Sequence, residues 1–390
     1  MAAMRTVNAL EARVRERLAA WEASGLLRVL RPPSGIDFSS NDYLNLASHP
    51  LIVERLVQAV AREGCGSTGS RLLRGERASF QAIERRFARF KGTEGALYFS
   101  SGFLANLAVL TTLAEQGDAI FSDDRNHASL IDGARLSAAR RVVFPHNDVN
   151  ELARLMAEAG AAGHRFVVVE SLFSMDGDMA PLAEYARLCH STGASLIVDE
   201  AHAVGIYGAT GSGLLEACGV DAHTCISVNT AGKALGVGGA FVAGPTWAID
   251  YLIQRARPFV FSTAAPPALA SALDASLDIV ANEPERRHRL AALARQLRSR
   301  LAEARVAVPT GTSQIIPIVI GDNERAVAVA SALQAQGFDV RAIRPPSVPP
   351  DTSRLRISVN AGLSEETIGH FAVSLAGALR EVGVCCAASS

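Results

Sequence analysis

Lys233 and Asp199 are the two residues of this sequence whose types and positions point most directly to a chemical reaction. Asp199 ends a short apolar run with the composition of a buried strand, and Lys233 follows in a glycine-rich stretch, residues 227–236. A lysine amine can form a Schiff base, and a carboxylate can keep a pyridine nitrogen protonated. Together they predict a site for pyridoxal 5'-phosphate. The structural alternative for Asp199 is a cap on the helix that follows.

His202 and Thr230 could complete such a site. His202 follows Asp199 closely and could donate a hydrogen bond to the phenolate oxygen of the ring, although a single histidine is more often an ordinary surface or core residue. The hydroxyl of Thr230 could bind the cofactor phosphate together with backbone amides of the loop. The alternative for Lys233 is a solvated or phosphate-facing lysine in a glycine-rich loop.

Three further segments have both a functional and a structural interpretation. Ser101-Gly102-Phe103 opens a helix after a strand, so it is either an ordinary N-cap or a cradle for the phosphate, because helix N-terminal amides favour anions. His127 is either a turn histidine or a ring that stacks on the cofactor. Arg356 is either a surface cation or a planar guanidinium that binds a substrate carboxylate.

The elements that must position these residues read as strands alternating with helices. Most of the strands are continuous apolar runs, which is typical of strands covered on both faces, so we expect a mostly parallel seven-stranded sheet between helices, an α/β fold. Ligands bind at the carboxyl ends of such strands, where most of the polar candidates fall. The expected strands are Ala96–Phe99, Ala119–Ser122, Arg141–Phe144, Phe166–Glu170, Leu196–Asp199, Cys225–Val228 and Ala240–Ala243.

The two ends of the chain read differently from this central part. Residues 8–23 predict an amphipathic helix, and the proline-rich segment 31–35 then breaks the chain. Beyond the central part, the pattern predicts a smaller α+β domain. Its expected elements are a long helical region at 267–305, strands at Ile315–Ile320, Val340–Ile343 and Leu355–Val359, and helices at 323–336 and from 364. We therefore expect an N-terminal segment at 1–44, a large cofactor-binding domain at 45–285 and a small C-terminal domain at 286–390.

Composition favours a small-molecule partner. The formal net charge is −1, which favours neither nucleic acid nor an anionic membrane, and 49% hydrophobic residues allow a large core. Polar residues interrupt the uncharged stretch 95–114, so a strand, a glycine turn and a buried helix explain it better than a membrane span. The six cysteines lack metal-ligand spacing, so we expect reduced thiols in a cytoplasmic protein and no metal site.

The assembled motifs resemble the α-oxoamine synthases, which are fold-type I pyridoxal-phosphate enzymes. The resemblance spans about residues 36 to 375, and it rests on the order and spacing of several motifs. These are Phe38–Leu44, Ser101–Phe103, Asn126–Leu130, Phe173–Asp178, Val198–His202, Thr230–Lys233, Phe261–Thr263 and Ile343–Pro349.

The resemblance implies specific roles. Lys233 would form the covalent link to the cofactor and move the substrate proton, Asp199 would pair with the ring nitrogen, and His127 would stack on the ring and contact the substrate. Around the cofactor would lie Gly102, Phe103, Ser174, His202 and Thr230, with Thr263 reaching the phosphate of the other subunit of a homodimer. Arg28, Asn41, Arg344, Ser347 and Arg356 would contact substrates.

Within this family, the run Arg344–Pro349 favours the members that condense L-alanine with a pimeloyl thioester in biotin biosynthesis. Ser347 departs from that motif, where threonine is usual, and this departure concerns the acyl pocket. The acyl carrier, coenzyme A or acyl carrier protein, is left open. The alternatives are a glycine C-acetyltransferase or another acyl-CoA-dependent oxoamine synthase, an aminotransferase of the same fold, and a non-catalytic binding protein.

Overall fold

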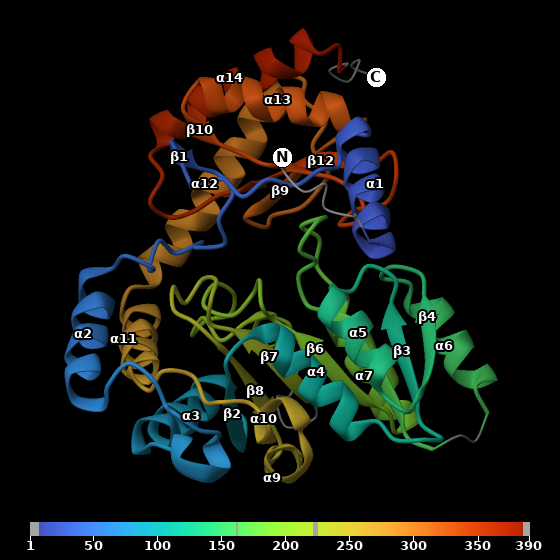
Figure 1. The fold of residues 1–390 in the computed structure, drawn as a ribbon, viewed down its shortest axis with the longest axis vertical. Helices are drawn as coiled ribbons and strands as arrows, with labels where there is room; N and C mark the ends of the chain where they lie inside the picture. Colours follow the sequence, from blue (N-terminus) through green and yellow to red (C-terminus); the bar gives the residue numbers. More distant parts are fainter. Residues whose placement is uncertain (1–7, 161–162, 221–224, 385–390) are drawn as a thin grey trace, which may run out of the picture. The chain divides into compact units, whose positions relative to one another are not determined.

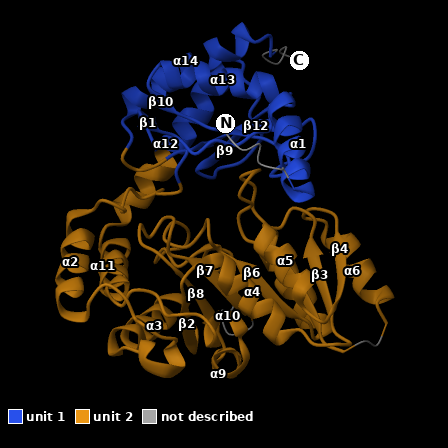
Figure 2. Ribbon diagram, in the orientation of Figure 1, with its two compact units in different colours: residues 1–40, 293–359, 363–390 blue, residues 41–292, 360–362 orange. Residues whose placement is uncertain are grey.

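The computed structural model describes residues 8–160, 163–220 and 225–384 (Figure 1). Contacts divide the chain into two compact units (Figure 2). Unit 2 comprises Asn41–Ala292 and Asn360–Gly362. Unit 1 comprises the described residues before Asn41, Leu293–Val359, and the described residues from Leu363 onward. The division at 40/41 and 292/293 differs from the three segments expected from the sequence, because the N-terminal segment groups with the C-terminal part.

Unit 2 is built on a seven-stranded sheet in the order β2-β8-β7-β6-β5-β3-β4. β8 is antiparallel to both of its neighbours, and the other neighbouring pairs are parallel. This confirms the predicted fold class. The strands are β2 (Gly95–Phe99), β3 (Ala119–Asp123), β4 (Arg140–Phe144), β5 (Arg165–Glu170), β6 (Ser195–Asp199), β7 (Cys225–Thr230) and β8 (Ala240–Gly244).

Helices cover this sheet, which explains why most of its strands are apolar and buried, whereas the edge strand β4 begins with two arginines and is largely exposed. Every residue of β3 and β8 is buried. The helix α4 (Gly102–Leu113) buries Ala105, Val109 and Leu110 in one cluster with strand residues such as Ile197. The stretch 95–114 is therefore a strand, a turn and a buried helix, and no helix among the described residues is long and apolar enough to cross a membrane. The other helices of unit 2 are α2 (Pro50–Glu63), α3 (Ala78–Lys91), α5 (Ala128–Leu136), α6 (Val149–Glu158), α7 (Leu182–Thr192), α8 (Leu214–Ala217), α9 (Thr246–Arg255), α10 (Arg257–Val260) and α11 (Ala268–Asn282).

Unit 1 combines short strands and helices, as expected of an α+β domain. Its three-stranded antiparallel sheet has the order β11 (Ala342–Ile343), β12 (Ser353–Ser358), β9 (Ile315–Gly321). β1 (Ile36–Asp37) pairs in parallel with β10 (Phe338–Asp339), so the N-terminal segment belongs to this unit. The helices are α1 (Ala9–Ala23), α13 (Asn323–Ala335), α14 (Glu365–Glu381) and most of α12 (Pro284–Glu303).

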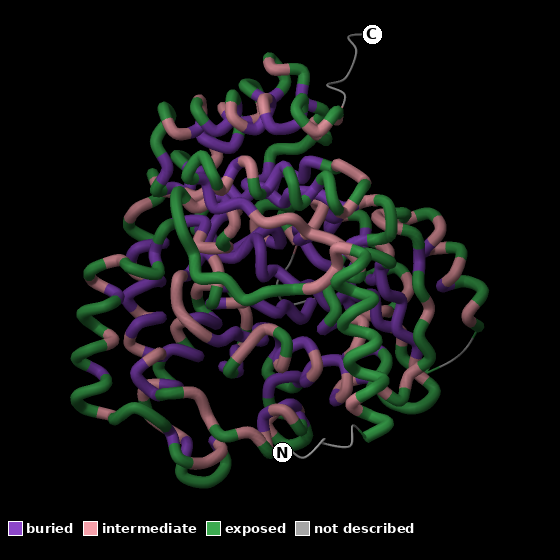
Figure 3. The backbone as a smooth tube through the Cα atoms, turned by 45° about the horizontal axis from the view of Figure 1, so that its top comes forward, coloured by how far each residue is buried: buried purple, intermediate pink, exposed green. Residues whose placement is uncertain are grey.

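Three expectations need correction. The predicted helix at the N-terminus exists as α1, but it has no buried residue, so its apolar side chains do not form a core face in the described chain (Figure 3). The long helical region is two helices, because Pro284 lacks the backbone N–H that would continue α11 and instead begins α12. Of the strand expected at Val340–Ile343, only the last two residues form a strand, β11, and the short strand β10 ends just before Val340.

Three cysteines within the described residues, Cys65, Cys189 and Cys218, are free thiols. Cys385 and Cys386 lie outside the described residues.

Candidate active site

Lys233 lies in the loop between β7 and β8, and its amine meets a buried histidine. Nζ of Lys233 is 2.9 Å from Nε2 of His202, a residue that is 5% exposed. The other ring nitrogen of His202 is 2.7 Å from the hydroxyl of Tyr43, which in turn donates to Oδ1 of Asn41 at 3.0 Å. The predicted residues Lys233, His202 and Asn41 are therefore joined in one chain of hydrogen bonds through Tyr43, which the sequence reasoning missed.

Lys233 is also set apart by the rarity of lysine. The sequence contains two lysines, Lys91 and Lys233. The side chain of Lys91 is 2% exposed, and its Nζ forms an ion pair with the fully buried Glu200 and donates to the carbonyl oxygen of Ser212. Because that amine is already engaged, Lys233 is the side-chain amine suited to covalent chemistry.

Asp199 and His127 are connected through a buried hydrogen-bond network. Oδ2 of Asp199 accepts from Nδ2 of Asn106 at 2.7 Å, and the same amide donates to Oγ of Ser129 at 2.9 Å. Ser129 Oγ lies 2.8 Å from Nδ1 of His127. Oδ1 of Asp199 accepts from the backbone N–H of Ala201 at 2.9 Å, so both carboxylate oxygens are fixed.

His127 caps the N-terminus of α5 and keeps much of its ring exposed. Its pKa is lowered, first because the surrounding protein partly removes water from the imidazole, and also because Lys233 is near; Asp199 acts in the opposite direction. Phe103 packs edge-on against the ring, with centroids 6.4 Å apart. A mostly neutral imidazole with an exposed face is suited to pack against a flat ligand.

The N-terminus of α4 has the geometry of an anion cradle. Ser101 caps the helix by accepting from the backbone N–H of Leu104 at 3.3 Å. Gly102 lies directly against Thr230 at the end of β7, and a Cβ at Gly102 would come far inside van der Waals contact with Oγ1 of Thr230. The helix amides, the Thr230 hydroxyl and the space left by Gly102 fit the phosphate of pyridoxal phosphate, while Asp199 and Lys233 fit its ring nitrogen and aldehyde.

Ser174 and Thr263 are placed differently with respect to this cluster. Ser174 is 9% exposed, and its backbone N–H donates at 3.3 Å to Oε2 of Glu170, which ends β5. Thr263 is exposed and lies beside Ala264, whose N–H donates to the carbonyl oxygen of Gly69. The role of Thr263 in a second subunit stays a prediction.

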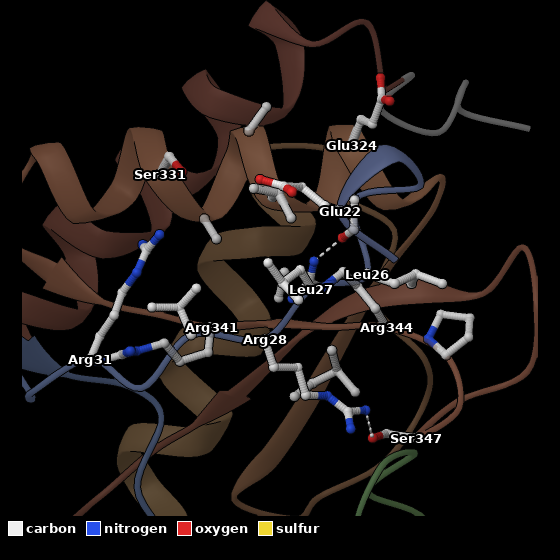
Figure 4. Close-up of a pocket in the computed structure, with 18 of the residues that line it drawn as sticks. Glu22, Leu26, Leu27, Arg28, Arg31, Glu324, Ser331, Arg341, Arg344 and Ser347 are labelled. Carbon is white, nitrogen blue, oxygen red and sulfur yellow. Dashed lines mark hydrogen bonds between the residues drawn. The ribbon is translucent and has the colours of Figure 1, made fainter. Parts of the chain in front are cut away.

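Three of the predicted substrate residues line a cavity of about 760 Å³ within unit 1 (Figure 4). Nη2 of Arg28 donates to Oγ of Ser347 at 3.3 Å, and Arg344 donates to the carbonyl oxygen of Gly25. The pKa of Arg344 is lowered, first by burial and then by the positive charges of Arg28 and Arg31. Four arginines and two glutamates, Glu22 and Glu324, line this cavity together with apolar side chains. Its formal charge is therefore positive, which suits an anionic ligand with a hydrocarbon portion.

Arg356 lies in β12 of unit 1. It is 7% exposed, and its Nη1 donates to Oγ of Ser358 at 2.9 Å. It is therefore not a surface cation. Its contact with a substrate carboxylate stays a prediction.

His146 forms a second polar cluster near the ends of β3 and β4. Nδ1 and Nε2 of its ring lie 2.9 Å from Asp123 Oδ1 and 2.6 Å from Asp178 Oδ2. The pKa of His146 rises to about 9 because these carboxylates outweigh the opposing effect of burial. Asp123, Asp124 and His146 bring ligand-type atoms within 4.8 Å of one another. Because both ring nitrogens already face carboxylates, we assign the cluster as a hydrogen-bond network.

The sequence reasoning missed four buried residues of the active-site cluster: Tyr43, Asn106, Ser129 and Glu170. Tyr43 and Ser129 lie inside motifs that carry the family resemblance, and Glu170 ends a predicted strand. Asn106 could have been suspected as a site residue, because it places a polar amide in a mostly apolar helix.

Comparisons with known proteins agree with this geometry. A family model described as aminotransferase class I and II matches residues 33–375. An 8-amino-7-oxononanoate synthase of Anaeromyxobacter dehalogenans is 45% identical over 378 residues, covering 94% of this chain and 95% of that protein. A solved structure described as SPT with a PLP internal aldimine has a TM-score of 0.90 at 29% identity, covering 98% of this chain and 100% of that one. An 8-amino-7-oxononanoate synthase structure from Francisella tularensis has a TM-score of 0.77 at 29% identity, covering 89% of this chain and 98% of that one.

Proposed function

Since this chain belongs to the class I and II aminotransferase family and, within it, to the α-oxoamine synthases, we propose that it condenses L-alanine with a pimeloyl thioester and releases carbon dioxide. This is the activity of an 8-amino-7-oxononanoate synthase in biotin biosynthesis. The enzyme is a pyridoxal-phosphate-dependent, decarboxylating acyltransferase. The predicted family and cofactor are thereby confirmed.

The observation that carries this proposal is the 45% identity to 8-amino-7-oxononanoate synthases over nearly the whole chain. The fold alone is less discriminating, because the SPT structure superposes with the higher TM-score, 0.90 against 0.77 for the Francisella synthase. We give sequence identity more weight, since related enzymes share a fold while their substrates differ.

Pyridoxal phosphate supplies an electron sink that stabilises negative charge at the α-carbon of an amino acid. In the proposed site, the carboxylate of Asp199 would face the ring nitrogen of the bound cofactor and favour its protonated form, and Asn106 keeps that carboxylate in place. The Lys233 amine removes and returns the proton at the α-carbon, and His202 lies within hydrogen-bond reach of that amine. His127 is held by the same network through Ser129 and would stack on the ring of the bound cofactor.

Substrate recognition is assigned to arginines. The guanidinium of Arg356 is suited to the carboxylate of alanine, because its planar donors match two carboxylate oxygens. Arg28, Arg344 and Ser347 are assigned to the acyl donor, since the cavity they line combines positive charge with apolar side chains. Asn41 is assigned to the amino-acid side of the site.

We further propose a cytoplasmic homodimer in which Thr263 reaches the cofactor phosphate bound by the other subunit. The support for this assignment is the family resemblance and the exposure of Thr263. The acyl donor arrives on coenzyme A or on acyl carrier protein, and rates with the two thioesters would identify the carrier.

Steady-state assays would test the substrate assignment. Alanine and glycine should be crossed with pimeloyl and acetyl thioesters, and we expect alanine with the pimeloyl donor to give the highest kcat/KM. A preference for glycine with acetyl-CoA would instead identify a glycine C-acetyltransferase.

A further inference from the structure

Glu170 is a buried acid in the site to which the proposed reaction gives no role. It ends β5 and is the register partner of Asp199, which ends the neighbouring strand β6. Glu170 is 2% exposed and Asp199 is 6% exposed. Two carboxyl groups thus emerge side by side from adjacent parallel strands, in surroundings with little water.

The two side-chain oxygens of Glu170 differ in their hydrogen bonding. The backbone N–H of Ser174 donates to Oε2 at 3.3 Å, and the backbone N–H of His127 also donates to this carboxyl group. Oε1 is buried and has no hydrogen-bond partner within the described chain. An ionised carboxyl group would therefore place negative charge on a buried oxygen that no donor stabilises, whereas the protonated group carries no charge and avoids that cost.

The charges around Glu170 also favour its protonated state. The negative charge of Asp199 on β6 disfavours ionisation of Glu170, whereas the positive charge of Lys233 in the loop after β7 favours it. His127, at the start of α5, has a lowered pKa and adds little positive charge near neutral pH. One lysine amine cannot compensate two buried carboxylates. The pKa of Glu170 accordingly rises to about 8, first because of burial and then because of Asp199.

We propose that Glu170 is a positioning residue that keeps its proton in the folded protein, so that Asp199 is the single carboxylate offered to the ring nitrogen. The part concerning the ring rests on the proposed function. The protonation of Glu170 does not, because it follows from residues of the chain alone.

The pH dependence of stability tests this protonation. A carboxyl group whose pKa is raised on folding stabilises the protein fully below its unfolded pKa of about 4.3, and this stabilisation is lost as pH rises through its folded pKa of about 8. Between these values, the unfolding equilibrium constant of the wild type should rise relative to that of Glu170→Gln by up to about tenfold per pH unit. Glu151→Gln is the control, because it changes a half-buried carboxylate whose pKa is lowered by Arg154, and it should not produce this difference between about pH 4.3 and 8. Parallel profiles for the wild type and Glu170→Gln would overturn the proposal.

A second measurement covers the case in which Glu170→Gln does not fold. Carbon-13 NMR of the wild type with labelled glutamate carboxyl groups should show a resonance that titrates near pH 8 and moves when pyridoxal phosphate is added. The absence of such a resonance would overturn the proposal. If the chain bound no pyridoxal phosphate, the proposed function would fail. The pH dependence of the stability of the full chain would still decide whether Glu170 is protonated.

The cofactor spectrum tests the positioning role. With pyridoxal phosphate bound, the wild-type absorbance should change as Glu170 ionises at alkaline pH, and this transition should be missing from Glu170→Gln. A transition that persists unchanged in Glu170→Gln would show that Glu170 does not act on the cofactor.

Discussion

Nζ of Lys233 lies 2.9 Å from Nε2 of His202. This contact joins the glycine-rich loop after β7 to the segment that follows β6. It places an amine and an imidazole ring within one hydrogen bond, and the strand that precedes His202 ends in the buried carboxylate of Asp199. The predictions below follow from this cluster and from the networks that hold it.

Borohydride reduction of the pyridoxal-phosphate-loaded chain should fix the cofactor on the peptide that contains Lys233. The only other lysine side chain, Lys91, is buried in an ion pair with Glu200. Peptide mass mapping should therefore find one adduct, which Lys233→Ala and the charge-retaining Lys233→Arg both remove. An adduct on Lys91, or one that persists in Lys233→Ala, would refute the assignment.

Asn106→Ala should raise the Kd for pyridoxal phosphate by about ten- to a hundredfold. It removes the donor that fixes Asp199 and connects it to Ser129, and a hydrogen bond to a charged group contributes about 1.5–3 kcal/mol. Spectrophotometric titration would measure the change. Thr111→Val is the matched control on α4, because this hydroxyl donates to the helix carbonyl of Leu107. Equal Kd values for the two variants would argue against the network.

Gly102→Ala should prevent the phosphate from binding normally. The added Cβ would collide with Oγ1 of Thr230 and occupy the cradle at the start of α4. We expect at least a tenfold rise in the Kd for pyridoxal phosphate, a loss of about 1.4 kcal/mol. Gly369→Ala on α14, where a Cβ meets nothing within 4 Å, should leave this Kd unchanged. If Gly102→Ala bound the cofactor like the wild type, the cradle would be misassigned.

His146 should make stability fall at alkaline pH. Its pKa rises from 6.5 to about 9 on folding, so its contribution is complete below pH 6.5 and is lost as pH rises through about 9. Chemical denaturation should show the stability advantage of the wild type over His146→Gln shrinking across this window. A constant difference would mean that His146 is neutral in the folded state.

The sequence predicted the fold well where burial alone decides the pattern. The seven apolar runs all form strands of the large sheet, and the polar residues at their ends come together because parallel strands end at the same edge. Lys233, His202 and Asp199 were found for this reason. The position of α1 was predicted correctly, but none of its residues is buried. Apolar residues at helical spacing do not reveal which surface, if any, packs against them.

The remaining site residues depend on tertiary packing. Asn106 reads as an interruption of an apolar helix, and only the position of α4 against β6 brings its amide to Asp199. Glu170 reads as the end of a strand, and its raised pKa follows from the register that sets it beside Asp199. Neither relationship can be derived from spacing along the chain.

The most direct test of the proposed reaction is the mass of the product formed from L-alanine and a pimeloyl thioester. We predict 8-amino-7-oxononanoate, with one carbon dioxide released for each thiol and no product from Lys233→Ala. Accumulation of pyridoxamine phosphate without carbon dioxide would instead identify an aminotransferase and contradict the account.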